Sequence, residues 1–110
     1  MGKNHLGEFE EVVMLTVALL GKQAYGYGII EELERRMNRS VTLGAMQTVL
    51  KRLEEKGYLQ SEFGEATTAR GGRRRRYYHL TNAGISVLEE TQEQRMGLWN
   101  DVLKLGFSRS

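Results

Sequence analysis

A dense group of arginines is the strongest chemical signal in this sequence. Five of the 16 basic residues fall between positions 70 and 76, and no acidic residue interrupts them. The other 11 basic residues (16 less 5) face 14 acidic ones, so the positive charge is concentrated here although the net charge is only +2. Closely packed like charges repel one another, whereas binding to nucleic acid gains from each arginine that neutralises a phosphate and releases counterions. We therefore favour nucleic-acid binding over an ordinary solvated charge run for Arg70, Arg73, Arg74, Arg75 and Arg76.

A second set of residues has the chemistry to read DNA bases. Residues 42–56 are expected to form a helix whose apolar stripe consists of Met46, Val49, Leu50 and Leu53. Gly44, Gln47, Thr48 and Lys51 then project from the opposite face. Glutamine and threonine can contact base edges, lysine can pair with a phosphate or a guanine, and Gly44 lets the backbone approach a phosphate. The solvated face of an amphipathic helix explains this set equally well.

Hydrophobic periodicity predicts the elements that position these two sets. Helices are expected over residues 8–20 and 25–37, followed by the helix capped by Thr42. A period of two predicts strands over residues 59–63 and 74–80, joined by a loop over residues 64–73, and Thr81 caps a last helix to about Lys104. Three helices, a hairpin and a long helix predict a mainly α (α+β) fold. This order is typical of a winged helix-turn-helix, whose second paired helix enters the major groove.

Two of the expected helices carry more apolar surface than the chain itself can cover. The helix over residues 8–20 is apolar on nearly every side, and the last helix has a broad apolar stripe. In a chain of 110 residues, this favours burial against a second copy. We therefore assign residues 1–80 to a winged helix-turn-helix DNA-binding domain and residues 81–110 to a C-terminal dimerisation helix and tail. The expected dimer interface consists of Phe9, Val13, Val17, Ile85, Leu88, Gln92, Met96, Val102 and Leu103.

The sequence lacks the residues that several other functions require. It has no cysteine, and its two histidines, His5 and His79, lie far apart, so we expect no disulfide, no metal site and no cofactor. Catalysis needs a nucleophile beside a base, a carboxylate pair or a metal, which makes an enzyme a poor alternative. No segment is apolar enough to cross a bilayer and no signal region follows Met1, so a cytoplasmic protein is expected.

Five motifs together resemble the PadR family of bacterial transcriptional regulators. They are Phe9-Glu10-Glu11, Ala24-Tyr25-Gly26-Tyr27, Gly44-Ala45-Met46, residues 50–58 and, most specifically, Arg70-Gly71-Gly72-Arg73 followed by Tyr77-Tyr78-His79-Leu80-Thr81. The resemblance covers about residues 6–90 and implies a dimeric repressor that acts on a pseudo-palindromic operator. The short last helix resembles the subgroup with a single dimerisation helix. The expected DNA-binding residues are Tyr25, Thr42, Gly44, Gln47, Thr48, Lys51, Arg70, Arg73, Arg74, Arg75 and Arg76.

One position departs from the family pattern. The helix that enters the groove usually carries tyrosine where this chain has Gln47, and glutamine can read adenine bidentately. An operator sequence is therefore not carried over from the family. The competing function is a winged helix that binds RNA or another protein without operator recognition.

The single tryptophan suggests an effector site. In some single-helix members, a tryptophan at this place lines a pore between the two subunits and stacks on flat, often cationic ligands. Trp99, with Met96 and Phe107 nearby, could bind a planar or hydrophobic small molecule that releases the operator. The alternative, which we rank first, is that Trp99 simply anchors the dimer interface.

Overall fold

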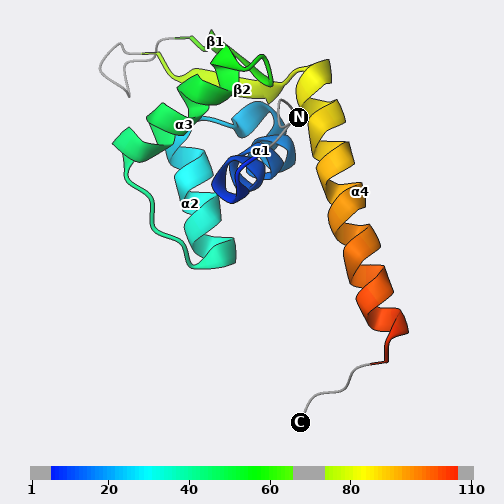
Figure 1. Ribbon diagram of the computed structural model, residues 1–110. Coiled ribbons are helices and arrows are strands. Elements are labelled where there is room, and N and C mark those ends of the chain that lie inside the picture. The colour runs from blue at the N-terminus through cyan, green and yellow to red at the C-terminus, as the bar shows by residue number, and fades with distance from the viewer. Residues whose placement is uncertain (1–5, 66–73, 107–110) are drawn as a thin grey trace.

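The helices and strands follow the predicted order. The computed structural model describes residues 6–65 and 74–106 (Figure 1). The second strand, β2 (Arg76–Leu80), begins at Arg76 rather than the predicted Arg74, because its pairing with the first strand, β1 (Leu59–Phe63), ends at the Phe63–Arg76 pair. Tyr25, predicted to lie inside the second helix, is instead its extended N-cap. The elements are α1 (Glu8–Leu20), the 3-10 turn η1 (Gly21–Gln23), α2 (Gly26–Met37), α3 (Leu43–Glu55), β1 (Leu59–Phe63), β2 (Arg76–Leu80) and α4 (Asn82–Lys104).

The core lies where α1, α2 and α3 meet the inner end of the hairpin. Met14 of α1 and Ile29 of α2 are fully buried there, and Leu59 of β1 closes one side. The predicted stripe of α3 is confirmed, since Met46, Val49, Leu50 and Leu53 are all buried. Helical spacing therefore orients α3 with its apolar face inward and its polar face toward solvent.

Two threonines cap helices as the sequence predicts. The Thr42 hydroxyl accepts a hydrogen bond of 3.1 Å from the backbone N–H of Ala45. The Thr81 hydroxyl accepts one of 3.0 Å from Gly84 N–H and donates one of 2.6 Å to the carbonyl oxygen of Gly57. Each cap satisfies an N–H group that the first helical turn leaves without an internal partner. Thr81 also joins the start of α4 to the end of α3.

The hairpin is held to the body of the molecule at one end and extends beyond it at the other. Leu59 pairs with Leu80 at the inner end, and Phe63 pairs with Arg76 at the outer end. The backbone N–H of Tyr78 donates a 2.8 Å hydrogen bond to the carbonyl oxygen of Ala24. This bond fixes the hairpin beside the first turn of α2.

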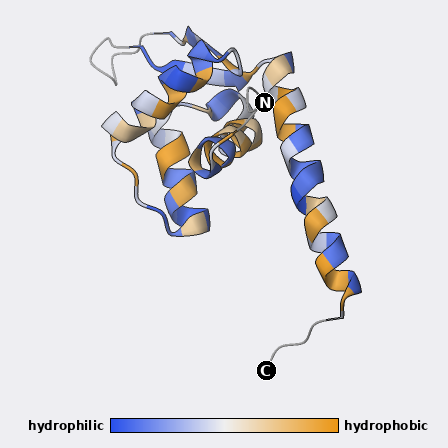
Figure 2. Ribbon diagram, in the orientation of Figure 1, coloured by the Kyte–Doolittle hydropathy of each residue, from blue (hydrophilic) through white to orange (hydrophobic). Residues whose placement is uncertain are grey.

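Helix α4 runs away from the rest of the chain (Figure 1). Within α4, the buried residues are Gly84, Val87 and Leu88, all in its first two turns. Hydrophobic residues remain exposed along the protruding part (Figure 2). No helix in the part of the chain that the structure describes has both the length and the apolar character to span a bilayer. The exposed apolar residues of this part are Met96, Leu98, Trp99, Val102, Leu103 and Leu105.

Some expected interface residues are covered by their own chain. Val13, Val17 and Leu88 lie in the core of the protomer, so their side chains are not on the surface that a second copy could touch. Phe9 is half-buried beneath the Arg39 guanidinium, which lies 4.8 Å from the centre of its ring. The chain leaves one face of α1 uncovered, where Leu15, Ala18 and Leu19 are exposed, so burial of this face against a second copy stays a prediction.

One acidic residue of α2 is buried. Its neighbours Glu31 and Glu34 are exposed, but the Glu32 carboxylate is largely covered and pairs with Arg35 and Arg36. The hydrogen bonds from Arg36 and Arg35 lower the pKa of Glu32. The two arginines stabilise the ionised carboxylate, which allows it to lie against the body of the protein.

The first turn of α1 is tied to three other parts of the chain by ion pairs. Glu8 pairs with Arg39 at 2.9 Å and Glu10 with Lys56 at 2.9 Å. Glu11 is buried and takes two partners from α4: Arg95 at 2.7 Å and Gln92, whose side-chain amide donates a bond of 2.6 Å. Gln92, which we expected in the dimer interface, therefore has a partner within its own chain.

Acid is expected to weaken the fold through Glu10. Burial tends to raise the pKa of this carboxyl, but hydrogen bonds from Lys56 and from Gly7 N–H outweigh it, so the pKa lies below its usual 4.5. The folded state therefore binds fewer protons than the unfolded chain, and the stabilisation is lost as the pH falls below about 4.5 through the lowered pKa. We expect Glu10→Gln to cost about 1–2 kcal/mol at neutral pH and to flatten this acid loss, measured by urea unfolding at several pH values.

Glu31→Gln is the matched control, because Glu31 is exposed on α2. It is expected to keep both the neutral-pH stability and the acid profile of the wild type. A Glu10→Gln profile parallel to the wild-type profile would show that Glu10 does not carry this acid sensitivity.

Candidate nucleic-acid interface

The polar face of α3 is exposed as predicted. Gly44, Gln47, Thr48 and Lys51 all lie on the surface opposite the buried stripe, and the cap residue Thr42 is exposed beside them. A side chain at Gly44 would meet no atom within 4 Å, so the backbone there is open to a ligand. The Thr48 hydroxyl donates a 3.0 Å hydrogen bond to the carbonyl oxygen of Gly44, yet it keeps acceptor capacity for an outside donor.

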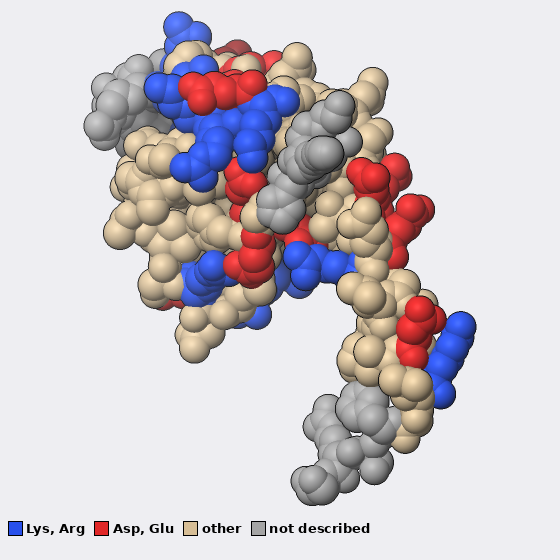
Figure 3. All heavy atoms as spheres, viewed as in Figure 1, with Lys and Arg blue, Asp and Glu red and all other residues tan. Residues whose placement is uncertain are grey.

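The structure brings α3, the start of α2 and the base of the hairpin to a single cleft. The cleft has a volume of about 870 Å³ and is open to solvent. Figure 3 shows several Lys and Arg side chains over α3 and the hairpin, with carboxylates among them. Two residues that sequence analysis did not assign to the site, Tyr27 and Phe63, also lie here and are largely exposed. The lining residues are Tyr25, Gly26, Tyr27, Leu43, Gln47, Leu50, Phe63, Arg74, Arg75, Arg76 and Tyr78.

Arg75 lies over the ring of Tyr25, which packs against Tyr77. Its guanidinium carbon lies 4.1 Å from the centre of the Tyr25 ring, and that ring meets the Tyr77 ring edge-on at a centroid distance of 5.8 Å. Gly64 makes room for Tyr77, because a Cβ at Gly64 would lie 2.6 Å from that ring. Tyr25, expected to bind DNA directly, is half-buried and supports Arg75 in this way.

Arg76 and Arg74 share the ring of Phe63. Their guanidinium carbons lie 4.8 and 5.7 Å from its centre. The Nε–H of Arg76 also donates a 2.8 Å hydrogen bond to the hydroxyl of Ser61, which in turn donates one of 2.6 Å to a carboxylate oxygen of Glu54. The outer end of the hairpin is therefore linked to the last turn of α3.

Tyr78 contributes a neutral hydroxyl to the cleft. Burial raises the pKa of its hydroxyl above the usual value, Arg76 opposes this and Glu54 adds to it. The hydroxyl of Tyr78 consequently keeps its proton at every pH at which the protein would meet nucleic acid.

The remaining expected site residues fall in two places. Arg70 and Arg73 lie outside the described residues, as does Phe107. Met96 and Trp99 are exposed on the protruding part of α4. This part of the helix runs away from α3 and the hairpin (Figure 1). The structure therefore separates the expected effector residues from the expected DNA-binding residues.

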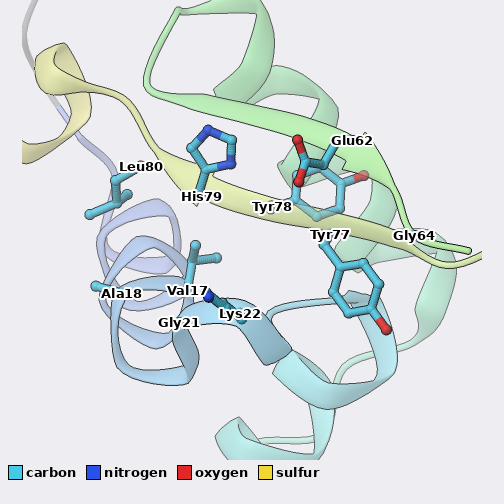
Figure 4. A pocket seen from close by; sticks show the side chains of 10 residues that line it. All are labelled: Val17, Ala18, Gly21, Lys22, Glu62, Gly64, Tyr77, Tyr78, His79 and Leu80. Carbon is cyan, nitrogen blue, oxygen red and sulfur yellow. The ribbon is translucent and has the colours of Figure 1, made fainter.

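A second hollow, of about 630 Å³, lies between β2 and the end of α1. Figure 4 shows Val17 and Ala18 of α1 on one side and β2 on the other, with Lys22 of η1 at the edge. His79 is within 3.2 Å of the side-chain oxygen of Gln60, so its ring already has a partner. In the described part of the chain, no group of three His, Cys, Asp or Glu residues could hold a metal ion. The cleft beside α3 remains the stronger candidate site.

Comparison with known proteins identifies the family. The family model described as "Transcriptional regulator PadR-like family" matches residues 14–90, well over half of the chain. This chain belongs to the PadR-like family. Members of the family regulate transcription, so the PadR-like chain is a regulator and not an enzyme.

Solved structures of PadR-like proteins share the fold of this PadR-like chain. A PadR-like transcription factor from Bacteroides fragilis is 33% identical, with a TM-score of 0.71 over 88% of each chain. A PadR family regulator from Clostridium difficile is 27% identical, with a TM-score of 0.70 over 90% of this chain and 99% of that one. An uncharacterised protein from Lysinibacillus sphaericus is 27% identical over 90% of this chain and 84% of its own length.

A more distant relative has been solved with DNA. Bacillus subtilis PadR, in complex with operator DNA, has a TM-score of 0.63 over 76% of this PadR-like chain and 47% of its own chain. At 20% identity, this likeness concerns the fold alone.

Proposed function

We propose that this PadR-like regulator binds duplex DNA sequence-specifically, with α3 in the major groove and the base of the wing, which is the β1–β2 hairpin, on neighbouring phosphates. The observation that carries the proposal is the cleft in which Gln47 of α3 faces the same space as Arg74, Arg75 and Arg76. Glutamine reads base edges and arginine neutralises phosphates, so the two readout chemistries lie side by side. The complex of Bacillus subtilis PadR with operator DNA supports this use of the fold.

We further propose that the regulator acts in the cytoplasm as a homodimeric repressor on a pseudo-palindromic operator. The exposed apolar residues on the protruding part of α4 need a cover, and a second copy related by a two-fold axis would supply it. Two copies would also present two α3 helices to two half-sites. Residues 1–80 would then bind DNA and residues 81–110 would form the dimer. Of the expected interface residues, Ile85, Met96, Val102 and Leu103 are exposed, and Leu98 and Leu105 join them.

DNA recognition is tested by fluorescence anisotropy on two duplexes: the region upstream of the protein's own gene and a scrambled sequence of equal length. The wild type is expected to prefer the upstream duplex, and both affinities are expected to fall with rising salt. Changing Gln47 and Thr48 together to alanine is expected to abolish the preference and to weaken binding to the upstream duplex by roughly 10- to 100-fold, because the base contacts are lost.

Gln94→Ala is the matched control, since Gln94 is an exposed glutamine on α4, away from the cleft. It is expected to bind like the wild type. Equal affinity of the wild type for both duplexes would refute sequence-specific recognition. Tighter binding to an RNA of the same sequence would favour the competing function of an RNA-binding winged helix.

The dimer is tested by introducing a charge on α4. Leu98 is 72% exposed in the single chain. Leu98→Glu is expected to convert a dimer into a monomer of 12.6 kDa in sedimentation experiments, because a buried unpaired carboxylate would cost several kcal/mol at the interface. Asn100→Glu adds the same charge to the same helix at a polar position and is expected to remain dimeric. A wild-type protein that is itself monomeric would contradict the proposal.

A small-molecule effector is part of the same proposal. In a dimer, Met96 and Trp99 of the two copies would line a shared space suited to planar or hydrophobic ligands. Quenching of Trp99 fluorescence by planar cationic compounds would support this site. A flat response across such compounds would favour the alternative role of Trp99 as an interface anchor.

A further inference from the structure

Phe63 is unusual in its position. It is 54% exposed at the outer end of β1, whereas Leu59, on the same face of the same strand, is buried in the core. An exposed phenylalanine among charged side chains adds nothing to core packing. Its ring instead makes contacts at the surface.

The contacts of Phe63 are guanidinium groups of the wing. Arg76 is the first residue of β2, and Arg74 lies two positions before it. Their side chains therefore project from the same side of the chain, and both reach the Phe63 ring. Arg75, between them, leaves on the other side and lies on Tyr25 instead. Three consecutive arginines are thus divided between two aromatic rings that line the same cleft.

This division has a physical consequence for binding. Free arginine side chains sample many rotamers, and this conformational entropy is lost when a ligand fixes them. A ring face attracts a guanidinium electrostatically and limits the directions in which it can point. Arginines fixed before the ligand arrives lose less conformational entropy on binding, which raises affinity.

We propose that Phe63 is a positioning residue of the DNA interface, whose ring holds Arg74 and Arg76 in the cleft before DNA binds. This role of Phe63 rests on the proposed DNA-binding function. The ring itself is not required to touch DNA. Ser61 assists at Arg76 through the 2.8 Å hydrogen bond that it accepts, so the effect at Arg76 is shared between two partners.

The test compares Phe63→Leu with Phe63→Tyr on the upstream and scrambled duplexes. Leucine keeps an apolar side chain but removes the ring, and we expect it to weaken binding to both duplexes roughly five- to tenfold. Tyrosine is expected to restore wild-type affinity. The slope of log K against log salt is expected to remain that of the wild type with leucine, because the number of phosphate contacts is unchanged. The melting temperature is also expected to remain unchanged. Met37→Leu, at a similarly exposed apolar residue at the far end of α2, is the control.

A second measurement needs no DNA. In the wild type, the side-chain protons of Arg74 and Arg76 are expected to show upfield ring-current shifts in the NMR spectrum, which Phe63→Leu removes.

A double-mutant cycle on DNA affinity is the third measurement. Phe63→Leu is expected to cost less affinity for DNA when Arg74 and Arg76 are already alanine.

The outcomes separate the two proposals. Wild-type affinity with Phe63→Leu, failure of tyrosine to restore binding, or equal losses with and without the two arginines would each overturn the role of Phe63 while leaving DNA binding intact. A wild-type protein that binds neither duplex would overturn the proposed function, and the DNA role of Phe63 with it.

Discussion

Gly84→Ala is expected to lower the free energy of unfolding by about 3 kcal/mol, measured by urea titration with circular dichroism. A Cβ at Gly84 would overlap the backbone carbonyl oxygen of Tyr58, which is fixed because it accepts a 3.0 Å hydrogen bond from Thr81 N–H. Backbone cannot move aside as a flexible side chain can. The clash would separate the first turn of α4 from the segment that joins α3 to β1, so DNA affinity is expected to fall as well.

Gly44→Ala is the matched control for stability. It is also a helical glycine, but a Cβ there meets nothing within 4 Å, so the alanine variant is expected to be at least as stable as the wild type. Equal stability of Gly84→Ala and the wild type would show that α4 can leave the Tyr58 carbonyl at little cost. That result would contradict the conclusion that α4 must pack closely against the Tyr58 carbonyl at Gly84.

Glutamine in place of Arg74, Arg75 and Arg76 together is expected to weaken DNA binding on the order of a thousandfold. Each arginine that contacts a phosphate contributes through charge and counterion release, so the salt slope is expected to fall by about 0.9 for each lost contact. Binding to the scrambled duplex is expected to fall in parallel, because phosphates carry no sequence information. Anisotropy titrations over a series of KCl concentrations measure both quantities.

The control changes Lys22 of η1 and Lys104 of α4 to glutamine. Both residues are exposed and neither lines the cleft, so the variant removes positive charge elsewhere on the surface. It is expected to bind within about threefold of the wild type, because charges beyond a Debye length are largely screened. A loss as large as that of the wing variant would attribute binding to net charge and refute a specific role for the wing.

The fold could be predicted from sequence because its local signals agree. The hydrophobic period changes from helix to strand after Gly57, and Thr42 and Thr81 mark helix starts with the caps that the structure contains. The polar face of α3 followed directly from the spacing of its buried residues. Gln47 and its neighbours were therefore placed correctly on the surface without any knowledge of tertiary structure.

Other features could not be predicted, because they depend on which part of the chain covers which face. An apolar pattern shows that Val13 and Val17 are buried, but it does not show whether the chain or a second copy buries them. Strand alternation places Phe63 on the face of Leu59, but the core ends before Phe63 is reached. The burial of Glu32 depends on two arginines that periodicity assigns to solvent.

The ion pair of Glu11 with Arg95 and its hydrogen bond with Gln92 fix the direction in which α4 leaves the body of the protein. A rod fixed at one point can swing, whereas α4 is fixed both at its first two turns and by this carboxylate about two turns further along. Beyond Leu88 the helix continues to Lys104 for ~24 Å, so a tilt of ~10° about the fixed turns would move its far end by ~4 Å. In the proposed dimer, such a tilt would change the separation of the two α3 helices by a comparable distance, about one base-pair step. A single buried side chain in the first turn of α1 would then set the spacing of half-sites that the regulator can span.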